Sequence, residues 1–205
     1  MERSRPSWNG LVVFDLGEVL ATPIDLYGRL AVVLSVDEEL VRNAYWVDRD
    51  AHDRGSSVED YWAGVATRVG AQPRAEISKQ LAEIDASAWA TIRADAESVL
   101  ADVKAAGSRI AILSNAPHPM AAAARASGWG QYIDHWFFSC ELEVAKPDLR
   151  VYEIVTERVG VAPRSILFFD DRQVNVEGAS ASGWDARLWT SGERTREVLL
   201  DLGIL

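Results

Sequence analysis

The sequence VVFDLGEVL, from Val12 to Leu20, joins an uninterrupted apolar run to Asp15, Gly17 and Glu18. Two further short runs have the same form: RIAILSN (109–115) and SILFFDD (165–171). Apolar runs of a few residues without alternation are typical of strands that are buried on both faces. The sequence therefore predicts three buried strands, each of which ends in polar residues.

Helix-like segments separate these strands. ESVLADVKAAG (97–107) is amphipathic and is closed by a glycine directly before the second strand. Similar segments follow the second strand and flank the third, and WFFS (136–139) and WDARLW (184–189) predict two further short strands. Strands that alternate with helices predict an α/β fold, a Rossmann-like core with a three-layer arrangement around a parallel sheet.

The polar residues at the strand ends are expected to share one crevice. In open parallel sheets, reactive groups collect at the carboxyl ends of the strands. Asp15, Ser114 and the pair Asp170 and Asp171 all stand where a predicted strand ends. We therefore expect these four side chains to form a single site.

Residues 21–95 have a different pattern, which is helical throughout. Ser35 or Asp37, and Ser57 with Asp60 three residues later, are candidate N-caps of these helices. We expect residues 21–95 to form a helical cap, inserted into a core that consists of residues 1–20 and 96–205.

Composition limits the partners. The chain has 205 residues and a formal net charge of -10, which argues against nucleic acid and anionic membranes because both require a basic surface. A single cysteine, Cys140, allows no intrachain disulfide and suits a reducing cytoplasm. The N-terminal stretch MERSRPSWNG does not resemble a signal peptide, and no apolar run is long enough to span a membrane. The pattern leaves open a monomer or a homodimer.

Four separated motifs, FDLGEV, ILSNA, AKPD and FFDD followed by Asn175, resemble the haloacid dehalogenase (HAD) superfamily, most of whose members are phosphatases. The order and spacing of the motifs match over nearly the whole chain. The helical insert resembles the small C1-type cap of that superfamily. The stretch AYWVDRDAHDRGSSVEDYW (44–62) is similar, more loosely, to sugar-phosphate phosphatases.

This resemblance implies a role for each matching residue. Asp15 would be the nucleophile, which attacks phosphorus and forms an aspartyl-phosphate. Ser114 and the backbone of Asn115 would hold the phosphoryl oxygens, and Lys146 would neutralise charge on the nucleophile and on the phosphate. The chemistry is consistent with these roles, because phosphoryl transfer needs an in-line nucleophile and cations that collect the developing charge.

The same resemblance implies a Mg²⁺ cofactor. Asp15, Asp171 and Asp170 would supply carboxylate ligands, and the backbone carbonyl of Gly17 would be a further ligand. Mg²⁺ prefers such oxygen donors. Asn175, four residues after Asp171, is expected to support the metal ligands.

Gly17 departs from the family pattern. Most phosphatases of the superfamily carry a second aspartate two residues after the nucleophile, and it protonates the leaving group and activates water. Glycine keeps the carbonyl but removes this acid, whose contribution is roughly 10²–10⁴-fold, or about 3–5 kcal/mol of barrier. If nothing replaces it, phosphorylated enzyme should accumulate. Glu18, His52 and His118 are candidate replacements.

Three functions are compatible with the sequence. The favoured one is a phosphatase for a small phosphorylated metabolite, possibly a sugar phosphate, similar to family members that carry glycine at this position. The second is a pseudo-enzyme that binds a phosphorylated ligand or a protein. The third is a 2-haloacid dehalogenase, although two acids beside Asp15 would repel each other without a cation. A helical stripe of cap residues either faces the crevice and selects the substrate or packs the cap against the core: Tyr45, Trp46, Arg49 and His52.

Overall fold

The computed structural model describes residues 8–205. The first seven residues lie outside this range. They include most of the stretch MERSRPSWNG, in which no signal peptide is expected. None of the described helices combines the length and the apolar character that crossing a bilayer requires.

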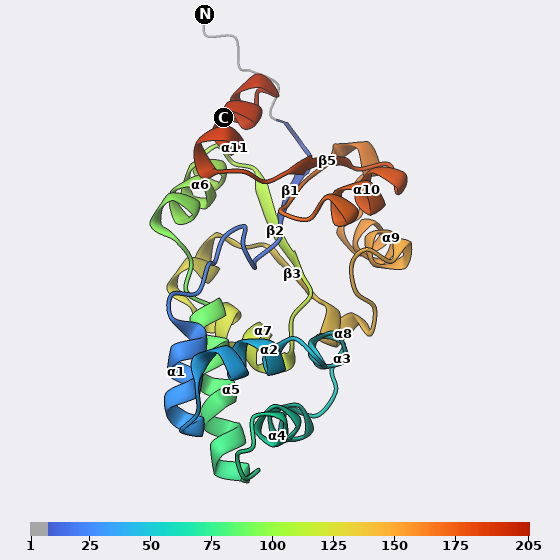
Figure 1. Cartoon of the computed structure of the whole chain (residues 1–205). Helices are drawn as coiled ribbons and strands as arrows, with labels where there is room; N and C mark the ends of the chain where they lie inside the picture. Colours follow the sequence, from blue (N-terminus) through green and yellow to red (C-terminus); the bar gives the residue numbers. More distant parts are fainter. Residues whose placement is uncertain (1–7) are drawn as a thin grey trace, which may run out of the picture.

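The centre of the molecule is a five-stranded parallel sheet in the order β3-β2-β1-β4-β5 (Figure 1). The strands are β1 (Leu11–Phe14), β2 (Arg109–Ser114), β3 (His135–Phe138), β4 (Ile166–Asp170) and β5 (Asp185–Leu188). The predicted α/β fold is thereby confirmed. The two short strands, β3 and β5, are present, and each of their ends lies one residue from the predicted position. Both neighbours of β1 are strands whose ends carry candidate site residues.

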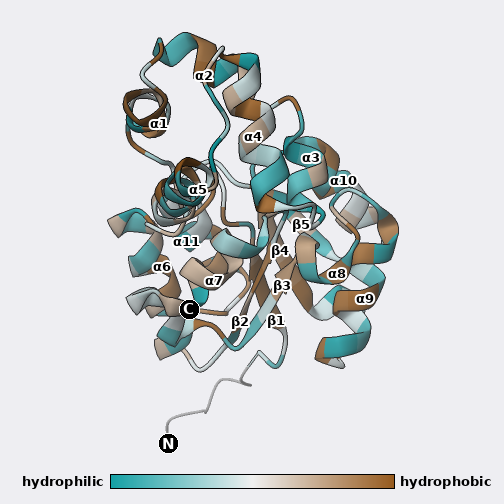
Figure 2. Cartoon of the chain, turned by 90° about the horizontal axis from the view of Figure 1, so that it is seen from below, coloured by the Kyte–Doolittle hydropathy of each residue, from teal (hydrophilic) through white to brown (hydrophobic). Residues whose placement is uncertain are grey.

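Helices cover both faces of the sheet (Figures 1 and 2). The helices from residue 94 onward are α6 (Ala94–Ala105), α7 (His118–Ala126), α8 (Ser139–Leu142), α9 (Leu149–Val159), α10 (Gln173–Ala181) and α11 (Gly192–Asp201), with 3-10 turns η1 (Gly128–Tyr132) and η2 (Pro163–Ser165). Residues alternate along β1: Val12 and Phe14 join an apolar cluster with α6, α7 and α11, whereas Leu11 and Val13 join a second cluster with α9 and α10.

Between β1 and α6 the chain forms only helices, here called the helical insert (residues 26–89). They are α1 (Leu26–Leu34), α2 (Glu38–Tyr45), α3 (Arg49–Asp53), α4 (Val58–Arg68) and α5 (Ala75–Trp89). Two N-caps lie where the sequence placed them: the Asp37 carboxylate accepts from Glu39 N at 2.8 Å, and the Ser57 hydroxyl accepts from Asp60 N at 3.2 Å. Ser35 instead ends α1, in the left-handed region at φ 55°.

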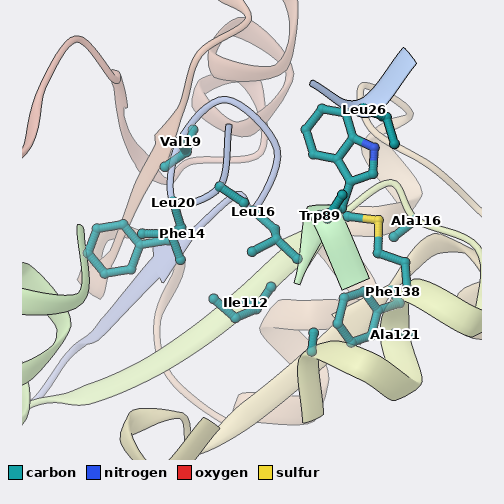
Figure 3. Packing of buried hydrophobic residues seen from close by; sticks show 14 of the residues in the cluster. Phe14, Leu16, Val19, Leu20, Leu26, Trp89, Ile112, Ala116, Ala121 and Phe138 are labelled. Carbon is teal, nitrogen blue, oxygen red and sulfur yellow. The ribbon is translucent and has the colours of Figure 1, made fainter. Parts of the chain in front are cut away.

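The insert shares its apolar core with one face of the sheet. Figure 3 shows Trp89 at the end of α5 near Leu16, in the cluster that also holds Phe14 and Ile112. The Val12 and Phe14 side of the sheet therefore continues into the insert. The cluster around α9 and α10 contains no insert residue among those described.

Candidate active site

Lys146 lies between two strand-end carboxylates. Its Nζ is 2.9 Å from Asp15 Oδ1 and 2.6 Å from Asp170 Oδ2, and all three residues are buried. The carboxylates are neighbours because β1 and β4 pair in parallel, with Asp15 N donating to the Phe169 carbonyl at 2.9 Å. The sheet register thus brings residues 15 and 170 to the same amine.

Asp15 is oriented through one of its oxygens. Oδ1 accepts from Leu16 N at 2.7 Å and contacts Lys146, so Oδ2 is the oxygen available for attack. Burial raises the pKa of Asp15 to about 7, and the charge of Asp170 acts in the same direction, whereas Lys146 and the Ser114 hydroxyl oppose the rise. A further cation at this site would favour the ionised form, which is the nucleophilic one.

Both carboxylate oxygens of Asp170 contact neighbouring residues. Oδ2 contacts Lys146, and Oδ1 accepts from Arg172 N and from Asn175 Nδ2, both at 2.9 Å. The side chain is completely buried. Asp170 therefore positions Lys146, and Asp171 is the acid of the pair that faces open space.

Asp15, Asp170 and Asp171 each offer a carboxylate oxygen, and these oxygens lie within 4.8 Å of one another. Burial and the neighbouring Asp170 raise the pKa of Asp171. With a single lysine among them, three ionised carboxylates leave a local charge of about -2. A divalent cation would offset that charge.

The donor set fits Mg²⁺, which takes carboxylate, carbonyl and water oxygens. No backbone N–H of the described residues donates to the Gly17 carbonyl, which leaves it free as a ligand. The Oδ1 of Asn175 is buried without a hydrogen-bond partner in the described part of the chain, and it lines the same cavity. Such an oxygen suits a metal-bound water.

Ser114 is the last residue of β2, Asn115 follows it, and the two side chains have different roles. Ser114 is buried and lines the cavity. The Asn115 side chain brackets the backbone of Lys146: Nδ2 donates to its carbonyl and Oδ1 accepts from its N–H, both at 2.9 Å. Asn115 thus fixes the segment that carries the lysine, a role that sequence reasoning did not assign.

A cavity of about 430 Å³ joins these strand ends to the helical insert. Its volume falls within the range of small-molecule sites. The core contributes Asp15, Gly17, Ser114, Lys146 and Asp171 to its walls, and the insert contributes Trp46, Arg49, Asp53 and Trp89.

Comparison with known proteins decides the family. The model of a family described as haloacid dehalogenase-like hydrolase matches residues 10–183. The chain belongs to the haloacid dehalogenase-like hydrolases.

Its relatives within that group differ in activity. Phosphatase MT3486 of Mycobacterium tuberculosis is 32% identical over 131 residues, which cover 62% of this chain and 59% of the relative. (S)-2-haloacid dehalogenase 4A of Burkholderia cepacia is 34% identical over 92 residues, 44% of this chain and 40% of the relative. The chain therefore matches about half the length of these relatives, and both phosphatases and dehalogenases are among them.

Solved structures show the same fold. L-2-haloacid dehalogenase from Xanthobacter autotrophicus, with chloropropionic acid covalently bound, has a TM-score of 0.74 at 21% identity, over 96% of this chain and 84% of its own. The HAD family enzyme bt-2542 from Bacteroides thetaiotaomicron, in complex with magnesium and inorganic phosphate, has a TM-score of 0.68 at 19% identity. The match covers 90% of this chain and 96% of that enzyme's chain.

In this haloacid dehalogenase-like hydrolase, two of the four predicted specificity residues line the cavity. Trp46 and Arg49 do so, whereas Tyr45 and His52 do not. The predicted stripe is interrupted because residues 37–52 form two helices, with a break between Tyr45 and Arg49. His52 is buried against Tyr61, with ring centroids 4.1 Å apart. Burial and Arg49 lower the pKa of His52 to about 4.

Buried polar residues of the insert surround Arg49. The guanidinium Nε donates to Asp53 at 2.7 Å, and Nη1 lies 3.3 Å from Asp85. The Tyr45 hydroxyl donates to Asp85 at 2.6 Å and accepts from Arg49 and from Trp89 Nε1. Sequence reasoning missed Asp53, Asp85 and Trp89. For Asp85 and Trp89 the only signal was their place among the apolar residues of one helix, and the polar segment RDAHD gave no signal for Asp53.

Gly17 lies directly under Trp89. A Cβ built on Gly17 would be 3.3 Å from the Trp89 ring, closer than most side-chain contacts. Trp89 is held there by its hydrogen bond to the Tyr45 hydroxyl at 2.9 Å. An aspartate at residue 17 would therefore have to share its space with this ring.

Proposed function

We propose that this hydrolase is a Mg²⁺-dependent phosphomonoesterase that acts through an aspartyl-phosphate at Asp15. Its substrate is a small phosphorylated metabolite such as a sugar phosphate. The observation that carries the proposal is the cluster of three carboxylates around one lysine. Its negative charge is matched to a divalent cation and, with that cation, to a phosphate group.

Each residue of the cluster has a task in this reaction. Asp15 Oδ2 attacks phosphorus, while Leu16 N and Lys146 hold Oδ1 and thereby fix the direction of attack. Ser114 lies beside the nucleophile, where its hydroxyl can donate to a phosphoryl oxygen. Mg²⁺, held by Asp15, Asp171 and the Gly17 carbonyl, would neutralise charge on the phosphate.

Relatives and neighbours support both the activity and the metal. Phosphatase MT3486 and the phosphorylated carbohydrates phosphatase of Thermotoga maritima are similar in sequence. A neighbour in fold is described in complex with magnesium and inorganic phosphate.

The similarity to (S)-2-haloacid dehalogenases makes halide release the competing activity. A 2-haloacid carries its own carboxylate, and displacement of halide by Asp15 supplies no cation. A phosphate ester carries more negative charge than a haloacid, but it is a ligand for the divalent cation that the carboxylates would hold, whereas displacement of halide makes no use of that cation. The carboxylate cluster therefore favours phosphate esters over haloacids.

The first experiment measures phosphate release from a panel of sugar phosphates and an activated aryl phosphate, with Mg²⁺ or with EDTA, for wild type and Asp15→Asn. We expect turnover that requires Mg²⁺ and vanishes in Asp15→Asn. A parallel assay measures chloride release from 2-chloropropionate. Chloride release without metal would favour the dehalogenase, and Mg²⁺ binding without turnover of any substrate would favour a pseudo-enzyme.

A further inference from the structure

Residue 17 supplies no proton in this protein, so a working phosphatase must take its acid and base from elsewhere. The inference that follows rests on the proposed function. A carboxylate at residue 17 would meet the Trp89 ring, 3.3 Å from the position of its Cβ. The leaving group lies on the insert side of the cavity, because the strand ends hold the phosphate.

Three carboxyl groups outside the strand-end cluster line the cavity: Glu18, Asp50 and Asp53. Glu18 and Asp50 are exposed, and Glu18 accepts a hydrogen bond from Thr22 at 3.1 Å. His52 and His118 do not line the cavity. Asp53 is the one of the three that is removed from bulk water.

Asp53 combines a fixed orientation with one free oxygen. Oδ1 accepts from Arg49 Nε at 2.7 Å, and the side chain is 13% exposed. Oδ2 accepts no hydrogen bond from the described residues and is not among the buried unpaired atoms, so it is accessible to solvent, and Asp53 lines the cavity. Burial raises the pKa of Asp53 to about 6, although Arg49 opposes the rise. A group with such a pKa can both give and take a proton near neutral pH.

One hydroxyl, that of Ser139, links the end of α3 to the loop at the end of β2 (residues 114–116), which holds the phosphate in the proposed function. Ser139 Oγ donates to the Asp53 carbonyl and accepts from Ala116 N at 2.9 Å. Ala116 follows Ser114 and Asn115 directly. Close packing adds to this contact, since a Cβ on Gly55 would lie 3.1 Å from the Cys140 carbonyl. The position of Asp53 is therefore set by the same loop that holds the phosphate.

We propose that Asp53 is the acid and base of this enzyme, in place of the side chain that residue 17 lacks. In the first step Asp15 Oδ2 bonds to phosphorus, and the bond from phosphorus to the ester oxygen breaks with its electron pair on that oxygen. The Asp53 carboxyl gives this oxygen its proton.

In the second step a water oxygen bonds to phosphorus and the Asp53 carboxylate takes a proton from that water. The bond between phosphorus and Asp15 breaks, which returns Asp15 as a carboxylate and Asp53 as an acid. Both groups thus regain their starting states after each turnover.

The test compares phosphate esters whose leaving groups range from nitrophenol to simple alcohols, in wild type and Asp53→Asn. We expect Asp53→Asn to lose about 10²–10⁴-fold on alkyl esters. It should keep a burst of nitrophenol, which needs no acid, and phosphorylated Asp15 should then accumulate by mass spectrometry. In the wild type, turnover should depend less steeply on the leaving group, and no phosphorylated Asp15 should accumulate. The asparagine oxygen can still accept from Arg49, and the nitrophenol burst itself reports a folded site.

Asp60→Asn is the matched control, because it removes an exposed carboxylate of the insert that does not line the cavity, and it should behave as wild type. Asp53→Glu keeps a carboxyl and should retain part of the turnover of alkyl esters. Equal dependence on leaving group in wild type and Asp53→Asn, equal losses in the Asn and Glu variants, or adduct in the wild type would overturn the assignment of Asp53. Absence of any Asp15-dependent turnover or adduct in the wild type would instead reject the proposed function and the inference with it.

Discussion

Two buried ion clusters face each other across the cavity, and each holds a cation between two carboxylates. They are Lys146 with Asp15 and Asp170 in the core, and Arg49 with Asp53 and Asp85 in the insert. The core cluster adds a third acid, Asp171, whereas the insert cluster adds the neutral hydroxyl of Tyr45. With every carboxylate ionised, the core cluster therefore carries a charge of about -2 and the insert cluster a charge of about -1.

The difference teaches what each cluster is built to do. Lysine is a compact point charge, which leaves room for a second cation beside it, and arginine is a planar group that donates in several fixed directions. Arg49 uses these directions to bind Asp53, Asp85 and Tyr45 at once. The core cluster is thus suited to binding a metal and a substrate, and the insert cluster to fixing side chains.

The largest expected effect comes from removal of each cation. Lys146→Met and Arg49→Met should each lower the free energy of unfolding by about 3–5 kcal/mol, because buried carboxylates lose their partner. The two variants should differ in how much Mg²⁺ stabilises them. The stabilisation by Mg²⁺ relative to EDTA, measured by urea unfolding, should exceed that of wild type in Lys146→Met and equal it in Arg49→Met. An equal response of the two variants would remove the distinction between the clusters.

A smaller effect should appear on acidification, because burial, together with Arg49 of the insert cluster, lowers the pKa of His52 and keeps it neutral. Its pKa is lowered from 6.5 to about 4, so between these values the unfolded chain binds the proton that the folded chain refuses. The stability that neutral His52 contributes is therefore complete above pH 6.5 and is lost as pH falls toward 4, by about 3 kcal/mol at most.

His52→Phe keeps the stack on Tyr61 and removes the titration. Its free energy of unfolding should fall less than that of wild type between pH 6.5 and 4, as measured by urea unfolding at several pH values. Asp53, whose pKa is raised, has the opposite slope but is present in both proteins and cancels in the difference. Parallel pH profiles would show that neither burial nor Arg49 lowers the pKa of His52.

The smallest effect concerns the contact where the two regions meet. Gly17→Asp should cost about 1–3 kcal/mol by overpacking against Trp89. The cost should shrink when Trp89→Ala is also present, which a double-mutant cycle detects as non-additivity. Trp184→Ala, in the cluster on the other face of the sheet, is the control and should be additive with Gly17→Asp. Additivity with Trp89→Ala as well would show that Trp89 does not exclude the acid.

The sequence predicted the sheet and the strand-end cluster because both follow from local order. A buried run such as ILFF fixes a strand, and parallel strands bring Asp15 and Asp170 to the same end of the sheet. The sequence did not predict all the residues of the insert that contribute to the candidate site. Asp85 lies 36 residues from Arg49, and their contact depends on how α3 and α5 are rotated relative to each other, which no local pattern encodes.

Side-chain tasks at the strand ends were also beyond the sequence. Adjacent acids look alike in FFDD, yet Asp170 is completely buried with both oxygens occupied, and Asp171 faces the cavity. The direction in which each carboxylate points depends on the turn after β4. For the same reason, the use of the Asn115 side chain as a bracket around Lys146 emerged only from the structure.

The shared apolar cluster has a kinetic consequence. Because one cluster runs from the sheet into the insert through Leu16 and Trp89, swinging the insert away would expose core residues to water. Wide opening therefore draws on the same free energy that holds the protein folded, and it must be infrequent. We therefore expect ligands to exchange through small, local fluctuations, and the cavity to admit compact solutes more readily than phosphate groups that are attached to large surfaces.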